Sequence, residues 1–562
     1  MIAKTGRLKD LADGKASRSQ LRSRYTAVVA AWLLGWLPQL LPAHDATPVT
    51  HSFDRGVPQP GPRLRISIED AASGRALAAR FAVSVDGRDY VPSWVDEHGI
   101  RFRSIHRTKR QEFTACYARG SGAVTIGLPS GARQVEVTAV RGFEFRPARA
   151  SAQVNADGAS IALRLDRWID LESQGWIGVD EHLHYDRMDP AADAYWLTML
   201  EADGLAAGHF MVLKGGMMPG IWARQFAYGA KGQASNGQQL IVPGQEYRDG
   251  AQGHINLLGI GAIIEPISTG GMGTPATREN FPPLHDVLLA ARKSGGLAGV
   301  AHAGTLGRTP TALADAVLGA VDFWELSNGF IYDTASWYRL MNCGVFIPPA
   351  AGTDLPNWPF RDPWQPMLGS VRMYVQTGGR RDFDACKAAV SDGRIFVTEG
   401  PALFLTVDDR GPGETIRLPA EGGTVTVRAE LQSPHSLRQL QLIQNGRAIE
   451  AVVRRDTDDA IQRWTIEKRL AVRESGWISA AGVGPRIASL NLDARAHAGV
   501  VRVLVGDRPV RQAEDVAQLE ATLTQQRDYY QQEGRYRNEA ERRHALNLFD
   551  RAIERLRSKR VR

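Results

Sequence analysis

The sequence predicts a multidomain protein with a central distorted β/α barrel, a β-sandwich on either side of it and a C-terminal helical tail. Its 562 residues are more than one ordinary hydrophobic core accommodates, so several domains are expected. Between Trp176 and about Val397, short apolar runs alternate with helical stretches. Before and after this region, short runs alternate apolar and polar residues, as the strands of half-buried sheets do.

The composition is that of a soluble globular protein, and the charge is only weak evidence for an anionic partner. Hydrophobic residues make up 43% of the chain and charged residues 23%. The net charge of +7 is modest for this length, and no nucleic-acid-binding module is recognisable, so no nucleic-acid partner is expected. Three cysteines without a CxxC motif exclude a disulfide framework and argue against a structural zinc ribbon.

The N-terminus has the pattern of an export signal, which we assign to residues 1–43. Three arginines between positions 18 and 24 precede an apolar run from Tyr25 to Leu41, and the small residue Ala43 follows. The protein is therefore expected in the periplasm or outside the cell, with no stable membrane insertion after signal removal. An uncleaved membrane anchor is the alternative. Residues 44–62 are predicted to be a linker.

Three further segments surround the centre of the chain. Residues 63–168 and 399–511 are each predicted to form a β-sandwich from short alternating strands. Residues 512–562 are rich in Glu, Gln, Arg, Leu and Ala, which indicates one or two amphipathic helices packed on the body. The alternatives for this basic tail are contacts with nucleic acid, an anionic membrane or another copy of the chain, so a homo-oligomer stays open.

The central segment, residues 169–398, is predicted to be the barrel. Its helical stretches are 190–203, 278–295, 311–319, 333–342 and 382–392. Strands that alternate with helices usually form a parallel sheet, and seven or eight such units form a barrel. Reactive residues in such barrels lie at the C-terminal ends of the strands.

The sequence GVDEHLHYD, from Gly178 to Asp186, contains the first candidate metal ligands. His182 and His184 are two residues apart, which places both imidazoles on one face of a strand. Neutral imidazoles in this arrangement are suitable ligands for one metal ion. Asp180 lies on the same face, where its carboxylate is expected to accept the second ring N–H of a ligand histidine.

Four more ionisable residues lie at or just beyond apolar runs. Glu246, His302 and Asp354 come near the ends of their runs, as the barrel rule expects. His254 does not fit this rule because it begins its run, HINLLGI. The six residues together predict a metal site, in which Asp354 or Glu246 also acts as a catalytic proton carrier.

These motifs are similar to those of a known superfamily. GVDEHLHYD resembles the GDxHxH opening motif of the PHP (polymerase and histidinol phosphatase) superfamily. PGQEY, GHINLLGI, VAHAG, ELSNG, YRLMNCGVFIPPAAGTD and GRIFVTEGPALFLTVDDRGPG resemble its carbaryl-hydrolase-like (CehA/McbA-like) branch, over roughly Trp176 to Gly413. The resemblance implies a distorted β/α barrel with one to three divalent ions. It also implies that His182 and His184 are first-motif ligands, that Glu246 bridges metals, and that His254, His302 and Asp354 complete the set.

The chain departs from the superfamily pattern in two places. The usual DH pair is absent from GHFMVLKGG, and Pro356 stands where the closing DxH motif has a histidine. One or two ions (Zn, Mn or Fe) therefore fit better than three. His209, within GHFMVLKGG, is a candidate substitute ligand or substrate contact, and the alternative is a packed strand residue.

The predicted function is hydrolysis of an ester, amide, carbamate or phosphoester by metal-bound hydroxide. Two long loops, 214–237 and 355–369, are expected to select the substrate, because they are rich in aromatic residues. Lys214 and Arg224 are candidate contacts for an anionic group. The alternative functions are a non-catalytic envelope protein that binds carbohydrate or polymer through a degenerate barrel, and an envelope structural protein whose tail makes oligomer contacts.

Overall fold

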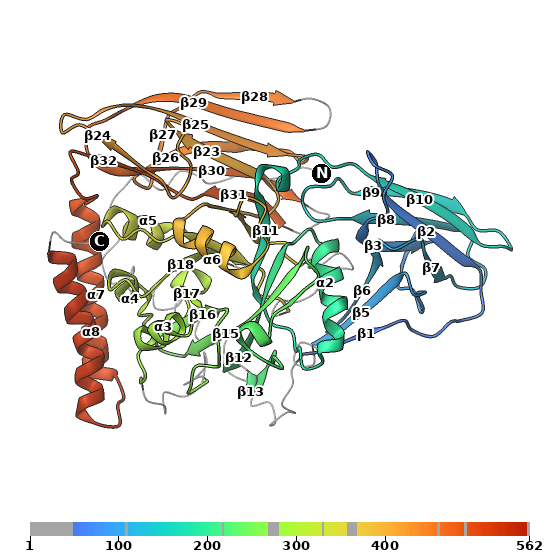
Figure 1. Cartoon of the computed structure of the whole chain (residues 1–562), viewed down its shortest axis with the longest axis horizontal. Coiled ribbons are helices and arrows are strands. Elements are labelled where there is room, and N and C mark those ends of the chain that lie inside the picture. The colour runs from blue at the N-terminus through green and yellow to red at the C-terminus, as the bar shows by residue number, and fades with distance from the viewer. Residues whose placement is uncertain are drawn as a thin grey trace, which may run out of the picture. The chain divides into compact units, whose positions relative to one another are not determined.

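The computed structural model describes residues 49–106, 111–215, 218–267, 280–328, 331–356, 368–457, 461–487 and 492–558 (Figure 1). The predicted export signal, residues 1–43, lies outside these ranges. So do the aromatic residues of the second predicted substrate loop, Trp358, Phe360 and Trp364, together with Arg361. Within the described ranges, none of the helices combines the length and apolar character needed to cross a membrane.

Two sheets enclose the first hydrophobic core. One has the order β1-β5-β6-β3-β8-β9 with β4 beside β3, and the other has the order β10-β2-β7. Their bounds are β1 Val49–Asp54, β2 Arg63–Asp70, β3 Ala78–Val85, β4 Arg88–Tyr90, β5 Gly99–His106, β6 Gln111–Arg119, β7 Val124–Gly127, β8 Gln134–Val140, β9 Ala148–Gln153 and β10 Ala159–Leu165. Alternate residues such as Leu64, Ile66 and Ile68 face the core, as the sequence pattern predicts.

The predicted linker, residues 44–62, is wrong in part, because Val49–Asp54 form β1 and pair with β5. Two rings of this strand pack on Trp196 of the central part, with centroid distances of 5.1 Å for His51 and 4.8 Å for Phe53. Aromatic burial thus holds the segment in place, although its local sequence is polar and contains prolines.

Seven principal strands form the central part. They are β11 Trp176–Leu183, β12 Ala207–Gly215, β15 Leu240–Asp249, β16 Gly253–Leu258, β17 Leu297–Val300, β18 Phe323–Asn328 and β20 Pro349–Gly352. Neighbouring strands pair in this order, and the bridge between Leu183 and Leu355 brings the chain just after β20 beside the end of β11. Shorter elements are η1 Glu172–Gln174, η2 Pro190–Ala192, β13 Met218–Trp222, η3 Gly229–Lys231, β14 Ala234–Ser235, η4 His302–Gly304 and β19 Ile331–Tyr332.

The helices of the central part lie where the sequence predicts them. They are α2 Asp193–Ala202, α3 Leu284–Lys293, α4 Ala312–Val317, α5 Ala335–Asn342 and α6 Phe383–Asp392. The sheet itself differs from the expected parallel arrangement. β11, β12 and β15 are parallel, and so are β17, β18 and β20, but β16 runs antiparallel to both of its neighbours.

The reversed strand β16 explains the position of His254. β15 and β16 form a hairpin in which Arg248 lies opposite His254 and Glu246 opposite Asn256. The beginning of β16 therefore lies beside the C-terminal end of β15. His254 joins the other candidate ligands although it starts its run, because the chain turns back at Gly250–Gln252.

The C-terminal sandwich is continuous with the central sheet. β21 (Arg372–Gln376) pairs with β11 and with β22 (Ile395–Thr398), and β22 pairs with β31, so hydrogen bonds cross the domain boundary predicted at residue 399. One layer is β23 Ala402–Val407, β25 Gly423–Ser433, β29 Gln462–Val472 and β28 Val453–Thr457. The facing layer is β24 Thr415–Leu418, β26 Gln439–Gln444, β27 Arg447–Ile449, β30 Gly476–Ile487, β31 Leu492–Ala498 and β32 Val501–Val505 (Figure 1).

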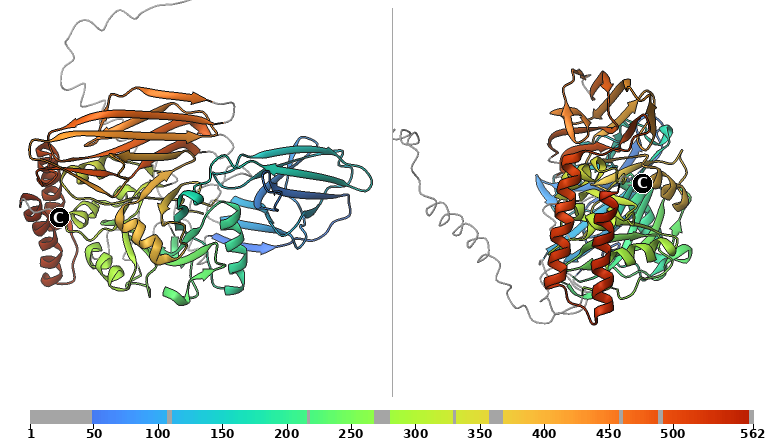
Figure 2. Two further views of the ribbon diagram at one scale, coloured as in Figure 1. Left: turned by 45° about the horizontal axis from the view of Figure 1, so that its top comes forward. Right: turned by 90° about the vertical axis from the view of Figure 1, so that its left-hand side faces the viewer.

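The tail forms two antiparallel helices, α7 (Ala513–Glu533) and α8 (Glu539–Arg557), which lie side by side (Figure 2). Their apolar residues, among them Leu519, Leu523 and Phe549, belong to the same buried cluster as the central strands. α7 packs on α5 and α8 packs on α4. The prediction of helices packed on the body is confirmed.

Truncation of a tail leucine tests whether α7 contributes to the central core. Leu519 is fully buried, so we expect Leu519→Ala to lower the free energy of unfolding by about 2–5 kcal/mol, through lost burial and the cavity that it leaves. Gln518, the preceding residue, is exposed, and Gln518→Ala is the matched control. Urea unfolding of both variants measures the difference, and equal midpoints would show that the tail is dispensable for the core.

Candidate metal centre

The structure brings all six predicted ligands together. His182 and His184 lie at the end of β11, Glu246 lies on β15 and His254 on β16. His302 begins the turn η4 after β17, and Asp354 follows β20. Each of the six is at most 3% exposed. Residues up to 172 positions apart thus share one buried site.

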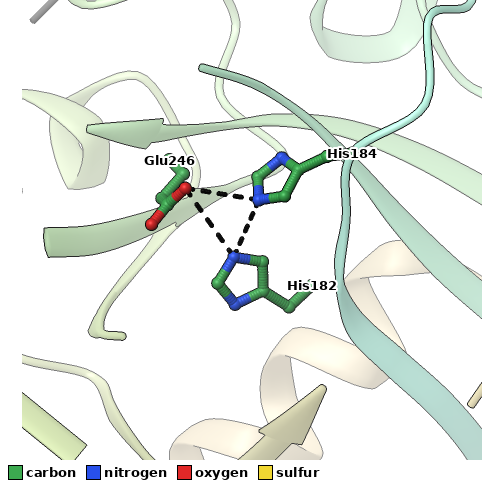
Figure 3. Close-up of side chains that lie close together, drawn as sticks. All are labelled: His182, His184 and Glu246. Atoms are coloured by element: carbon green, nitrogen blue, oxygen red, sulfur yellow. Dashed lines mark hydrogen bonds and ion pairs between the residues drawn. The ribbon is translucent and has the colours of Figure 1, made fainter. Parts of the chain in front are cut away.

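His182, His184 and Glu246 point toward one another (Figure 3). The two Nε2 atoms of the histidines are 3.0 Å apart. Oε2 of Glu246 lies 3.2 Å from Nε2 of His184 and 3.9 Å from Nε2 of His182. These three donor atoms form a compact triangle.

The other three residues complete the cluster around the same carboxylate. Oε1 of Glu246 lies 3.2 Å from Nδ1 of His254 and 3.6 Å from Nε2 of His302. Asp354 lies between the histidines, with Oδ1 at 3.2 Å from Nε2 of His184 and Oδ2 at 3.4 Å from Nε2 of His302. Both oxygens of Glu246 therefore lie beside histidine nitrogens.

The tautomers of His182 and His184 follow from their outer contacts. Nδ1 of His184 lies 2.9 Å from the carbonyl oxygen of Met211, and Nδ1 of His182 lies 2.9 Å from Oε1 of Glu325. Each Nδ1 is therefore the N–H donor, which leaves a lone pair on each Nε2. Two lone pairs that face each other at 3.0 Å repel, so either a proton on one Nε2 or a metal ion between the two stabilises the arrangement.

The charges of the site favour a cation as well. Burial alone raises the pKa of Glu246 and Asp354, but the neighbouring cationic and imidazole groups hold the pKa of both well below the ordinary value. Burial lowers the pKa of His254 to about 3, and the positive charge of Arg248 contributes to this shift. His254 is consequently neutral at pH 7, as a metal ligand must be.

The donor atoms fit a divalent ion. Both oxygens of Glu246 and Nδ1 of His254 are buried, and among the described residues none of them takes part in a hydrogen bond of normal geometry. Nitrogen ligands about 2.0–2.1 Å from one tetrahedral zinc ion lie about 3.4 Å from each other. The separations of 3.0–3.5 Å between His182, His184 and Asp354 are close to this value. Buried His/Glu groups of this chain can therefore hold a metal ion.

Asp180 contributes in a different way from the one expected. Its carboxylate accepts hydrogen bonds from the backbone N–H groups of His182 (3.1 Å), Thr353 (3.0 Å) and Gly369 (2.8 Å), and from the hydroxyl of Thr353 (2.7 Å). It fixes the backbone around two ligands and does not orient an imidazole ring. The neighbouring Gly352 permits this close packing, because a Cβ there would lie 2.5 Å from Cβ of His182.

Glu325 on β18 has the role that the sequence analysis gave to Asp180. One carboxylate oxygen accepts the Nδ1–H of His182 and the amide of Asn328, and the other accepts the backbone N–H of His302. Glu181 and Asn256 lie in the same buried network, joined by a hydrogen bond of 3.2 Å. The sequence analysis missed these residues. A glutamate inside the apolar run VDFWELSN was the available signal, because buried carboxylates need partners.

The predicted substrate contacts lie outside the cluster. The ring of His209, on β12, packs against Phe383 of α6 with centroids 6.1 Å apart, so its role as a packed strand residue is the one observed. Arg224 is half exposed and pairs with Asp186 at 3.4 Å. Lys214 is partly buried near the end of β12. An aromatic residue, Trp222, lies beside the site, with its ring centroid 5.5 Å from that of His184.

No family model, curated protein or solved structure matches this chain significantly. The resemblance to the CehA/McbA-like branch of the PHP superfamily therefore stays a prediction, carried by the motifs themselves.

Replacement of Glu325 tests the outer support of the ligands. In Glu325→Gln an NH₂ group replaces one oxygen and faces the N–H of either His182 or His302, so one ligand loses its orientation. We expect metal affinity to fall by about 10- to 100-fold, as measured by competition with a chromogenic chelator. The half-exposed Glu414, paired with Arg410, provides the control Glu414→Gln. An unchanged affinity in Glu325→Gln would mean that the ligands need no such support.

Proposed function

We propose that this protein is a metal-dependent hydrolase that cleaves an ester, amide, carbamate or phosphoester bond. The observation that carries the proposal is the pair of imidazole Nε2 atoms 3.0 Å apart, each with its Nδ1–H already donated to another acceptor, beside the two acidic residues Glu246 and Asp354. Four histidines with two carboxylates are the ligand types of hydrolytic Zn, Mn and Fe sites. We propose one or two such ions.

His182, His184, His254 and His302 would hold the metal through nitrogen, and Glu246 and Asp354 through oxygen. When bound, a divalent ion with an open position supplies activation of water at neutral pH and polarises the bond under attack. Asp354 or Glu246 would hold the transferred proton through a carboxylate oxygen that does not bind the metal. The burial of all six residues limits bulk water at the site and strengthens these interactions.

The proposal includes the type of barrel and the cellular location that the sequence predicts. In the mixed central sheet the end of the first principal strand, Leu183, bridges to Leu355, just after the last principal strand, which agrees with a distorted PHP-like barrel. The reaction would take place in the periplasm or outside the cell, on a small-molecule substrate.

Metal content is the first test. We expect purified protein to contain one or two transition-metal ions per chain by elemental analysis, and the double variant His182→Ala/His184→Ala to lose them, because it removes two nitrogen ligands. His209→Ala is the matched histidine control, since this buried ring lies against Phe383 and outside the cluster. Folded wild-type protein that contains no metal and takes none up would rule out the proposal.

The hydrolytic activity of the same samples is then measured. A panel of chromogenic esters, carbamates and phosphoesters should yield at least one substrate whose hydrolysis stops on chelation and returns with Zn²⁺ or Mn²⁺. Metal content without hydrolysis of any of these classes would favour the non-catalytic binding protein, and hydrolysis that survives complete metal removal would contradict the mechanism.

Proton release on metal uptake is a second expected property. Burial by itself lowers the pKa of His182, but Glu325 and Asp354 raise it well above the ordinary histidine value. In metal-free protein at pH 7, His182 should therefore be protonated on both ring nitrogens, and an incoming ion would displace the Nε2 proton. Affinity should decrease with falling pH, about tenfold per pH unit for each displaced proton. Calorimetry in buffers of different ionisation enthalpy measures this release, and uptake without it would contradict the assigned protonation.

A further inference from the structure

A cavity of about 260 Å³ lies at the opposite end of the central strands from the candidate metal centre. The first three residues of β11, Trp176–Gly178, line it, together with residues that come just before the parallel strands β12 and β15, which are Gly204–Ala206 and Gln239. His182 lies at the other end of β11, about 20 Å along the strand from Trp176. The cavity is therefore separate from the metal centre.

The N-terminal sandwich forms the other side of this cavity and contributes Arg75, Arg141 and Arg167 to its lining. The guanidinium carbons of Arg141 and Arg167 lie 5.6 Å and 4.9 Å from the centroid of the same ring, that of Phe145. The side chain of Arg141 is only 12% exposed. Two cations thus lie close together in the wall, one of them largely removed from water.

Carboxylates near these arginines offset their charge only in part. Glu201 pairs with Arg141 at the long distance of 3.5 Å, and Asp170 pairs with Arg167 at 3.2 Å. Arg75 is exposed, and no acidic group pairs with its guanidinium in the part of the chain that the structure describes. Burial lowers the pKa of Arg141. Glu201 opposes this shift, while the positive charges of Arg167 and Arg75 add to it.

The other glutamates of the lining have partners of their own. Glu172 pairs with Arg381, and Glu144 accepts the backbone N–H of Leu171 at 3.1 Å. The lining contains four arginines and three glutamates, so positive charge is in excess in the cavity. A bound anion would offset this excess.

The arginine wall is held in a fixed position. Gly142, next to Arg141, has a φ of +51° and packs against the turn before β12, where a Cβ would come within 2.8 Å of the carbonyl oxygen of Asp203. Arg141 itself donates to the carbonyl oxygen of Ala78. Donors that are already oriented lose little conformational freedom when a ligand binds.

The ligand chemistry follows from the guanidinium groups. Carboxylate and phosphate oxygens match the planar fork of an arginine, and such charge-assisted contacts are stronger than those between neutral groups. The cavity is slightly smaller than the usual site of a drug-sized ligand, so it is suited to a small molecule. We propose that this cavity binds a small oxyanion, a carboxylate or a phosphate, through Arg75, Arg141 and Arg167. This site is independent of the proposed hydrolysis.

Calorimetric titration of inorganic phosphate and of succinate into the purified protein tests the proposal. We expect at least one of these anions to bind, and to raise the midpoint of thermal unfolding, because a ligand of the folded state stabilises it. Arg141→Gln and Arg167→Gln should each weaken binding by about 10- to 100-fold, the effect of one lost charge-assisted contact. Arg75→Gln should weaken it less, because this side chain is exposed. Phosphate and succinate distinguish the two sources of oxyanion.

Arg88→Gln is the matched control, since Arg88 is an exposed arginine of β4 in the same sandwich and outside the lining of the cavity. The variant His182→Ala/His184→Ala should bind the anion as wild type does, and loss of binding there would instead place the anion at the metal centre and overturn the proposal. Arg141→Gln removes a buried group, so Arg167→Gln decides if that variant does not fold. Equal affinity in Arg167→Gln and wild type would overturn the proposal, as would wild-type protein that binds neither anion.

Discussion

Burial of ionisable groups is the constraint on which the centre of this structure depends. Four imidazoles and two carboxylates lie within a few ångströms of one another, almost without access to water. Such groups are stable inside a protein only where each has a partner of suitable charge or hydrogen-bonding character. Glu325 and Met211 satisfy the outer nitrogens of two histidines, and Asp180 fixes the backbone beneath them. The atoms that face inward need partners as well, and buried His/Glu groups in this arrangement can hold a metal ion.

The β15–β16 hairpin carries two of the six clustered residues, Glu246 and His254. In a purely parallel sheet the beginning of β16 would lie at the opposite end from Glu246. The reversal instead places His254 beside the end of β15 and Arg248 one step further out on the same face. One tight connection thus supplies a carboxylate, an imidazole and a guanidinium to the same side of the site.

The parts of the chain outside the centre support the strands that carry ligands. α4 and α5 lie next to β17, β18 and β20 in sequence, and the tail helices cover them with apolar residues of the same cluster. β21 pairs with both β11 and β22, and so connects the central strands to the C-terminal sheet. β1 packs aromatic rings on α2. Because packed cores deform little, these contacts keep the ligand-bearing loops in fixed positions.

The sequence by itself determined the elements and most of the candidate ligands. Helical stretches in the sequence located all five central helices, and five of the six clustered residues were identified by their positions at the ends of apolar runs or in the HxH pair, whereas His254 begins its run. These features are local, since they follow from spacing along a strand or helix. The tertiary structure decided what is paired across the chain. Glu325 contacts His182 from 143 residues away, and the reversed strand that brings Arg248 to His254 has no signature in periodicity. Direction of a strand and partners of a buried charge depend on long-range packing, which no local pattern contains.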